Sequence, residues 1–419
     1  MRRAQSLFLP VLLLALSVPQ PARAYAIFTH QALIDLTWND SIRPLLAARF
    51  PGITEAELNR AHGYAYGGCV IQDMGYYPFG KHIFSDLTHY VRSGDFVVAL
   101  LREARNADEY AFAIGALSHY VGDSIGHSRA INPATGITFQ NLAAKYGPDV
   151  TYEEDPIAHI RTEFGFDVAQ IAWQRYAPGA YRRLVGFHVA RALLDRAFYK
   201  TYGLSVRSVL GPQRSAIGSY HYSARHILPR FAKITVVNAR GHLPQEIDDS
   251  WRRQFLSGIS QTDYQRQWGN THHRPGITAH ILAFVVRIVP KIGILKVLSI
   301  KTPSPATEDL FFKSMSEAQD VFRRVLARLS NDPPADLALA NRDLDTGEHV
   351  KPGAYVLTDK TYAQLLGKIT ADDALPVPPG LREDILAYYS DPAAPISTKK
   401  NAKEWKKILA ELAILKGRD

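Results

Sequence analysis

The sequence predicts an all-α protein, in which a multi-helix metal-binding domain is followed by a further, mainly helical C-terminal region. Three observations lead to this fold class. Apolar residues recur at intervals of three and four along most of the chain, as they do in helices with one buried face. Few segments alternate in the way that strands do. Finally, His119, Asp123 and His127 are spaced four apart, which places all three on one stripe of a helix.

The helical periodicity predicts individual elements in order along the chain. The segments are Ala32–Trp38, Asp95–Glu103, Glu109–Gly122, Pro156–Trp173, Tyr181–Tyr199, Thr307–Leu329 and Glu404–Leu415. Only Lys233–Asn238 and Ala354–Thr358 alternate enough to suggest strands. Close helix packing is the expected role of Gly67 and Gly68, since no phosphate-binding or nucleophile motif surrounds them.

Clusters of proline, glycine and aspartate divide the chain into four expected parts. These are an export signal over 1–24, the metal-binding domain over 25–235, a helical extension with an apolar, basic segment over 236–332, and a helical region over 333–419.

The N-terminus is typical of a cleaved secretory signal. Arg2 and Arg3 precede the apolar run Leu7–Val18, which is too short to span a bilayer, and Ala22–Ala24 forms a small-x-small cleavage site. We therefore expect export to the periplasm or the extracellular space, with Tyr25 as the first mature residue. Its free amino group would lie five residues before His30, so the two could chelate a metal; the alternative is an ordinary chain start and a surface histidine.

Composition limits the remaining possibilities. Apolar residues make up 46% of the 419-residue chain, enough for a substantial core. The formal charge is +9, and +6 without the signal, which contains three arginines and no acid; a basic exported protein favours anionic lipid or nucleic acid as a partner. Cys69 is the one cysteine, so no intrachain disulfide can form and stability must come from the core and, if present, from bound metal.

The stripe formed by His119, Asp123 and His127 is the strongest chemical signal. Two imidazoles and a carboxylate are good ligands for zinc or a similar divalent ion. The central carboxylate of Asp123 could reach two ions. The alternative interpretation is that these are core residues that have found hydrogen bonds, but a buried acid at this spacing then needs another partner.

Two further segments contain candidate ligands. Asp73 lies in a glycine-flanked apolar segment, where a buried acid needs a partner, although a turn aspartate is also consistent with the pattern; either His82 or His89 could complete a site with it. Pro156 suits the first turn of a helix that would place His159 and Glu163 on one face. That pair could chelate a metal or form a surface His–Glu contact.

Taken in order, these residues make the chain resemble the zinc-dependent phospholipase C family, which shares a trinuclear zinc site with the S1/P1 nucleases. The resemblance covers roughly residues 25–175. It is most specific at His119-Tyr120-x-Gly122-Asp123 and at His159-x3-Glu163. Family members usually begin with tryptophan where this chain has Tyr25, but only main-chain atoms of that residue would bind.

The resemblance implies an all-helical domain that holds three zinc ions. The first ion would be held by Asp73, His89 or His82, His119 and Asp123; the second by Tyr25, His30 and the bridging Asp123; and the third by His127, His159 and Glu163. Asp73 is also implied as the general base that orients the attacking water. The stripe on one helix would thus be divided among three ions.

The expected activity is hydrolysis of glycerophospholipids to diacylglycerol and a phosphorylated head group. The alternatives are a single-strand nuclease or nucleotidase with the same site, and a non-catalytic, metal-stabilised lipid-binding protein. Peripheral membrane contact is possible, because Ile277–Ile300 and Ser397–Asp419 combine apolar and basic residues. Ile277–Ile300 could equally be a buried helix, and for Ser397–Asp419 packing against its own domain is the favoured interpretation. Nucleic acid is the less favoured partner, and the sequence indicates no protein partner.

Overall fold

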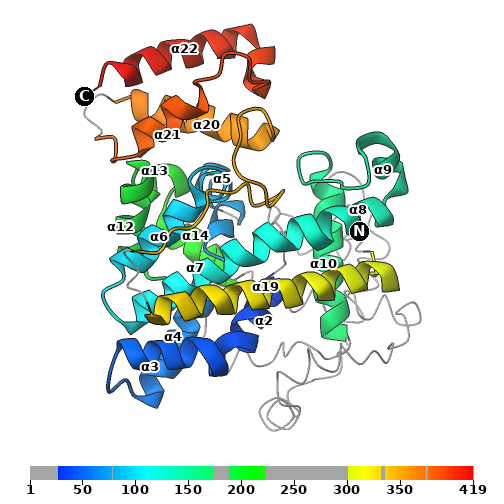
Figure 1. Cartoon of the computed structure of the whole chain (residues 1–419), viewed down its shortest axis with the longest axis vertical. Helices are drawn as coiled ribbons and strands as arrows, with labels where there is room; N and C mark the ends of the chain where they lie inside the picture. Colours follow the sequence, from blue (N-terminus) through cyan, green and yellow to red (C-terminus); the bar gives the residue numbers. More distant parts are fainter. Residues whose placement is uncertain are drawn as a thin grey trace, which may run out of the picture.

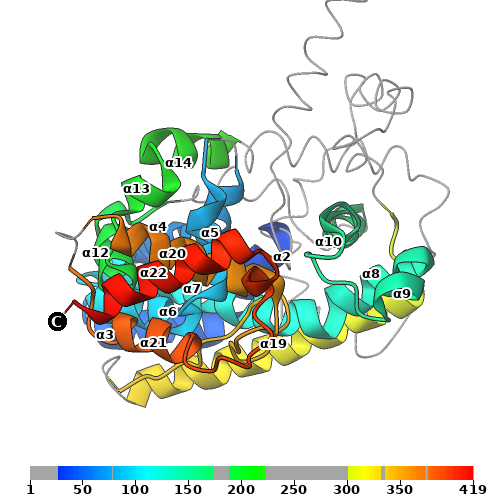
Figure 2. The same cartoon turned by 90° about the horizontal axis from the view of Figure 1, so that it is seen from above.

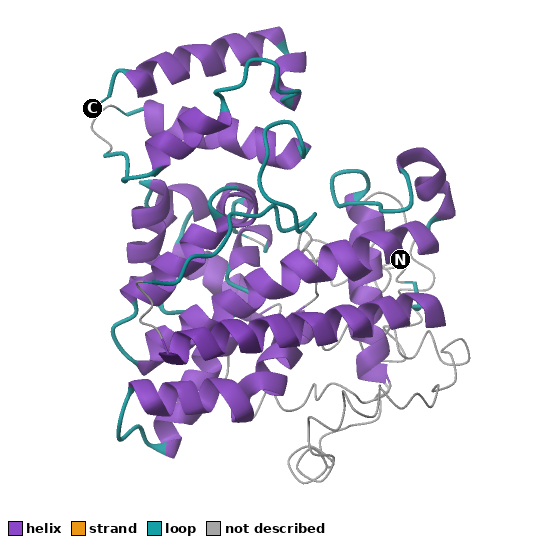
Figure 3. Cartoon of the chain, viewed as in Figure 1, coloured by secondary structure: helices purple, strands orange, loops and turns teal. Residues whose placement is uncertain are grey.

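The computed structural model describes residues 27–77, 79–172, 188–222, 301–331, 336–372 and 376–418. Every regular element within these ranges is a helix, and their one extended pairing is an isolated antiparallel bridge between Arg342 and His349 (Figure 3). The predicted all-α fold is therefore confirmed. No helix in these ranges is both long enough and apolar enough to cross a membrane.

The long helix α7 lies at the centre of the structure, with α4, α2 and α19 packed around it (Figure 1). It begins where the Asn106 side chain accepts a hydrogen bond from the Glu109 amide at 2.9 Å. The elements of this group are α2 (Ile27–Thr37), η1 (Trp38–Ile42), α3 (Arg43–Arg49), α4 (Glu55–Gly68), α7 (Ala107–Gly126) and α19 (Pro305–Asn331).

A second group of helices covers one end of α7, and the C-terminal helices lie over it (Figure 2). Helix α20 packs on α5, and α22 packs on α20. The elements are η2 (Gln72–Tyr76), α5 (His82–Tyr90), α6 (Ser93–Glu103), α12 (Arg191–Tyr202), α13 (Val206–Leu210), α14 (Gln213–Tyr222), α20 (Val356–Thr370), α21 (Leu381–Tyr388), η6 (Ser397–Lys400) and α22 (Ala402–Lys416).

The other end of α7 continues into one wide π-helical turn, and α8 follows without a break. A third group of helices follows from this turn, and α10 returns to contact α2. Its elements are η3 (His127–Ile131), α8 (Asn132–Thr138), α9 (Gln140–Tyr146) and α10 (Pro156–Ala172).

Glycines allow α4 and α7 to approach each other closely. A Cβ atom on Gly68 would lie 2.0 Å from the Phe112 carbonyl oxygen, and one on Gly115 would lie 2.1 Å from that of Ala65. No real side chain fits at such distances. The predicted close packing at Gly68 is therefore confirmed, and Gly67 makes a similar contact, with a Cβ 1.9 Å from the His188 carbonyl oxygen.

Two expectations about secondary structure need correction. Ala354–Thr358 is not a strand, because α20 begins at Val356 and the Thr358 hydroxyl is buried in a hydrogen bond to Asp343. Strand propensity over five residues is weaker than the packing of a 15-residue helix. In the segment Tyr181–Tyr199, the described helix begins only at Arg191, after three non-helical residues.

Some expectations lie outside the described residues. They are the export signal 1–24, Tyr25, the possible strand Lys233–Asn238, the segment Ile277–Ile300, and both domain boundaries near 235 and 333. These stay predictions.

Candidate metal centre

Six elements direct histidine and carboxylate side chains into the interior of the protein. Helix α2 supplies His30, η2 supplies Asp73, and α5 supplies His89. The remaining predicted ligands are His119 and Asp123 on α7, His127 at the start of η3, and His159 and Glu163 on α10. Each of these eight residues is at most 1% exposed. The sequence left open that some of these residues form solvent-exposed pairs on the surface. Their burial excludes this alternative.

Three histidine rings converge on the carboxylate of Asp123. Its Oδ1 lies 3.2 Å from His30 Nε2. Its Oδ2 lies 3.1 Å from His119 Nε2 and 3.3 Å from His89 Nε2. The two oxygens thus face different histidines, which is the arrangement that a carboxylate bridging two ions needs.

Two of these rings are oriented by main-chain carbonyl groups. Nδ1 of His119 lies 3.0 Å from the Cys69 carbonyl oxygen, and Nδ1 of His89 lies 2.8 Å from that of Ser85. Donation of an Nδ1 proton to each carbonyl fixes the tautomer in which Nε2 is a free ligand atom. The two Nε2 atoms lie 3.3 Å apart. The close approach of α4 to α7 brings Cys69 within reach of His119.

Asp73 lies beside this convergence. Its Oδ1 is 3.5 Å from His89 Nε2, and within the described residues neither of its carboxylate oxygens meets the geometry of a hydrogen bond. A fully buried carboxylate in this state is costly unless a cation neutralises it. The donor set of Asp73, His89, His119 and Asp123 therefore fits a divalent ion.

A second convergence lies at the start of η3 and on α10. His159 Nε2 is 3.1 Å from His127 Nδ1 and 3.0 Å from Glu163 Oε1. The His159–Glu163 contact has the predicted i, i+4 spacing. Because the chain changes from α- to π-helix at His127, this ring faces α10 while Asp123 faces α2 and α5. Such wide turns occur frequently at functional sites.

Considered by distance, these side chains form three groups. Each has its ligand atoms within 4.8 Å of one another: His30, His119 and Asp123; Asp73, His89 and His119; and His127, His159 and Glu163. Mixed imidazole and carboxylate donors of this kind are typical of zinc sites, with bonds of about 2.0–2.2 Å that place neighbouring ligand atoms roughly 3–3.5 Å apart. The distances of 3.0 Å between His159 and Glu163 and 3.5 Å between His89 and Asp73 agree with this spacing.

The electrostatics of the groups reflect buried charges of opposite sign. Burial alone would lower the pKa of His89, but contacts with Asp123 and Asp73 raise it to about 10. Burial alone would raise the pKa of Asp123, but the surrounding histidines, His119 foremost, hold it well below its usual range. The pKa of His30 is lowered by burial and by the charge of His119. The buried carboxylates thus favour positive charge beside them, which a bound cation can supply.

The structure distinguishes His82 from His89, which the sequence left as alternative partners of Asp73. His89 is fully buried and faces Asp73, whereas His82 is exposed at the start of α5 and its ring contacts the edge of Tyr76. His82 belongs to none of the three groups found among the described residues.

Sequence reasoning missed one acid near the third group. Asp345 is fully buried with its Oδ1 3.7 Å from His127 Nε2. The pattern Asp343-x-Asp345-x-Gly347 is typical of a turn, but nothing in such a pattern shows which distant side chain the turn contacts.

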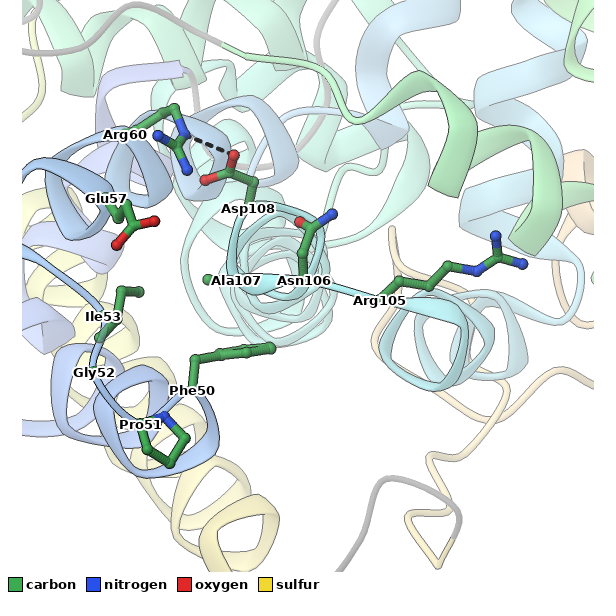
Figure 4. A pocket seen from close by; sticks show the side chains of 10 residues that line it. All are labelled: Phe50, Pro51, Gly52, Ile53, Glu57, Arg60, Arg105, Asn106, Ala107 and Asp108. Atoms are coloured by element: carbon green, nitrogen blue, oxygen red, sulfur yellow. Dashed lines mark hydrogen bonds and ion pairs between the residues drawn. The ribbon is translucent and has the colours of Figure 1, made fainter.

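The candidate ligands do not line the surface pockets that are formed by described residues. One of about 520 Å³ opens beside the start of α4 and the start of α7, where Arg60 and Asp108 form an ion pair of 2.7 Å (Figure 4). None of the eight buried ligand candidates lines it.

The described residues form an all-α scaffold that gathers three buried groups of histidines and carboxylates, each with the ligand types that could hold a metal ion. The family profile of zinc-dependent phospholipase C matches residues 29–210 of this chain. That segment, which contains all eight buried candidates, therefore belongs to the zinc-dependent phospholipase C family. Searches of curated proteins and of solved structures gave no match.

Proposed function

We propose that this protein is an exported phospholipase C that uses three zinc ions to hydrolyse glycerophospholipids to diacylglycerol and a phosphorylated head group. The observation that carries the proposal is the burial of three histidine–carboxylate groups within the segment that matches the family. The family supports a zinc-dependent, phospholipase C-like hydrolase with a lipid substrate; the ion count, the ligands and the export belong to our proposal.

We assign the ligands as the family resemblance implies. Asp73, His89, His119 and Asp123 hold one ion. His30 and Asp123 hold a second together with the main chain of Tyr25, and His127, His159 and Glu163 hold the third. The convergence of His30, His89 and His119 on the two oxygens of Asp123 supports its role as the bridge.

The protein's own groups then have defined tasks in the reaction. When bound, zinc neutralises the charge of a phosphodiester, acidifies the attacking water and stabilises the leaving alkoxide. Asp73 acts as the general base, because a carboxylate oxygen without a hydrogen-bond donor is available to accept a proton from the attacking water. The carbonyl groups of Cys69 and Ser85 hold two imidazoles in place through the reaction.

The basic chain supports an anionic or zwitterionic lipid surface as the place of action. The formal charge of +9 falls to +6 when the signal with Arg2, Arg3 and Arg23 is removed, and this charge attracts an anionic membrane over a distance of about one Debye length, near 8 Å at physiological salt. Peripheral contact of this kind needs no spanning helix.

The test offers purified mature protein two substrates, phosphatidylcholine vesicles and single-stranded DNA, each with zinc and with a chelator. We expect release of phosphocholine that the chelator abolishes, and a loss of at least about 100-fold in Asp73→Asn, the lower end of general-base contributions. Asp149→Asn removes an exposed acid and serves as the control. Cleavage of DNA alone would replace the lipase with a nuclease, and bound zinc without any turnover would indicate a lipid-binding protein.

A further inference from the structure

A loop beyond the family match places a carboxylate against the third group of ligands. The loop lies within residues 336–355, directly before α20, and its Asp345 is completely buried. The family profile ends at residue 210, so neither the profile nor the family resemblance assigns this residue.

The loop that carries Asp345 is held by its own hydrogen bonds. Asp343 Oδ1 accepts from the amides of Asp345 and Thr346 at 3.0 and 3.1 Å, and its Oδ2 accepts from the Thr358 hydroxyl at 2.6 Å. Gly347, with φ +72°, lies so close to α7 that a Cβ would be 2.2 Å from the Ser124 carbonyl oxygen. The loop therefore has a fixed position relative to the helix that carries Asp123.

The Asp345 side chain is fixed as well. Its Oδ2 accepts hydrogen bonds from the hydroxyls of Tyr90 and Tyr355, at 2.7 and 2.6 Å. Its main-chain carbonyl accepts from Asn132 Nδ2 at 2.8 Å. Tyr90 directly follows His89, and the Leu344 amide donates to the His89 carbonyl at 3.2 Å. Asp345 thus connects α5, α8 and α20.

The other carboxylate oxygen faces a ring of the third group. Asp345 Oδ1 has no hydrogen-bond partner among the described residues, and His127 Nε2 lies 3.7 Å away. The opposite ring nitrogen, His127 Nδ1, is the one that faces His159. One nitrogen of the imidazole is therefore directed at the candidate ligands and the other at a buried carboxylate.

We propose that Asp345 is a positioning residue that orients His127 and raises its basicity as a metal ligand. Histidines that bind metals regularly direct their second ring nitrogen to a carboxylate, and loss of that partner weakens metal binding about 10–100-fold. The inference rests on the proposed metal centre. It assigns the C-terminal region a part in that centre, although the region lies outside the family match.

The experiment measures zinc affinity and stoichiometry by competition with a chromophoric chelator, so it needs no substrate. In Asp345→Asn, the hydroxyls of Tyr90 and Tyr355 favour the amide oxygen at the Oδ2 position, where it can accept their hydrogen bonds. The amide NH₂ group then points toward His127, and the contact between His127 and a carboxylate is lost. We expect one ion to bind about 10–100-fold more weakly, with the other two unchanged. Glu348→Gln, an exposed acid of the same loop, is the matched control and should bind like the wild type.

Two further measurements keep the test decisive. The cobalt-substituted protein should show an altered visible spectrum in Asp345→Asn, which a merely structural change distant from the ions would not produce. Tyr355→Phe keeps the carboxylate of Asp345 but removes one of its two hydrogen-bond donors, so the affinity for the same ion should decrease only a few-fold. If Asp345→Asn does not fold, Tyr355→Phe is used for the test instead.

The outcomes separate this inference from the proposed function. Wild-type protein that binds no zinc tightly would overturn both. Wild-type protein with three tight ions, together with variants whose three affinities stay within about twofold, would overturn only the role of Asp345. Equal weakening of all three ions would also contradict it, because positioning of His127 concerns a single group.

Discussion

At the scale of single residues, Asp123 differs from every other candidate ligand because both of its oxygens face histidines. His30 approaches one oxygen and His89 and His119 approach the other. Glu163 on α10, by contrast, contacts His159 of the third group through its Oε1. The two acids are equally buried, so a comparison between them separates bridging from simple coordination.

We therefore predict that Asp123→Asn disturbs two ions whereas Glu163→Gln disturbs one. An amide lacks the negative charge and offers only one oxygen, so it cannot bridge two cations. Metal analysis after dialysis against a buffer with a weak chelator should find about one zinc ion in the first variant and about two in the second. Equal losses in both variants would show that Asp123 serves a single ion.

Asp167 on α10 provides a second residue-scale prediction, because it anchors the beginning of α2 next to His30. Its oxygens accept from the Phe28 amide at 3.0 Å and the Thr29 hydroxyl at 2.7 Å, yet burial raises its pKa to about 7. The folded protein therefore binds this proton between about pH 4 and pH 7, whereas the unfolded chain releases it. The contribution of Asp167 to the free energy of unfolding falls as pH rises through that window.

Asp167→Asn should remove this dependence. The free energy of unfolding of the variant relative to the wild type is expected to increase by up to about 1.4 kcal/mol per pH unit between pH 5.5 and 7. Urea titrations of both proteins at each pH, with excess zinc, measure the difference. A difference that stays constant over this range would mean that Asp167 is ionised in the folded protein throughout.

The candidate site was predictable from the sequence where ligands share a helix. His119 with Asp123, and His159 with Glu163, follow from the i, i+4 spacing alone. The remaining ligands depended on the family resemblance, because periodicity does not tell where η2, α5 and α2 meet. Asp345 was not predictable by either route, since it reaches the site from a loop that neither helix spacing nor the family pattern describes.

At the scale of elements, long amphipathic helices were predicted with nearly correct ends. The segment Thr307–Leu329 lies within α19, and Glu404–Leu415 lies within α22. The incorrect strand prediction at Ala354–Thr358 shows the limit of such reasoning. Five residues rich in strand-forming types can include the first turn of a helix when one face of that helix is buried. No sequence pattern predicted the π-helical turn that begins at His127, although this turn separates His127 from His119 and Asp123 on α7.

The α4–α7 contact gives an element-scale prediction. Gly68→Ala should destabilise the protein by about 1–3 kcal/mol, the range of substitutions that overpack a core, since the added Cβ meets the Phe112 carbonyl and not a flexible side chain. Gly218→Ala, at an exposed position in α14 with nothing within 4 Å of its Cβ, is the control. It should be neutral or stabilising by up to about 1 kcal/mol, because alanine favours a helix more than glycine does. Thermal unfolding of both variants measures the contrast, and similar stabilities would contradict the packing argument.

Separation of α4 from α7 should also affect the metal site. The Cys69 carbonyl that orients His119 directly follows α4, so a shift of this helix lengthens the 3.0 Å contact. The helix contact and the ligand geometry are thus one structural feature.

At the scale of the whole molecule, the candidate ligands connect segments that are distant in the chain. Helices α2, α5, α7 and α10 meet at the three groups, and the loop before α20 reaches the third group through Asp345. Without disulfides, these buried groups are the places where cross-links between the helical groups can form. Bound metal should therefore contribute to the stability of the described fold as a whole and not only to its activity.

Removal of the metal should lower the melting temperature of the entire molecule. An ion present at 1,000 times its dissociation constant stabilises the folded state by about 4 kcal/mol, which corresponds to roughly 8 °C or more for a domain of about 200 residues. Circular dichroism at 222 nm should show this decrease after chelation and its reversal by zinc. Magnesium is the control and should fail to restore the melting temperature, because it prefers oxygen ligands in octahedral geometry and these groups are rich in imidazole. An unchanged melting temperature in protein shown by elemental analysis to be free of zinc would contradict the coupling of metal binding to folding.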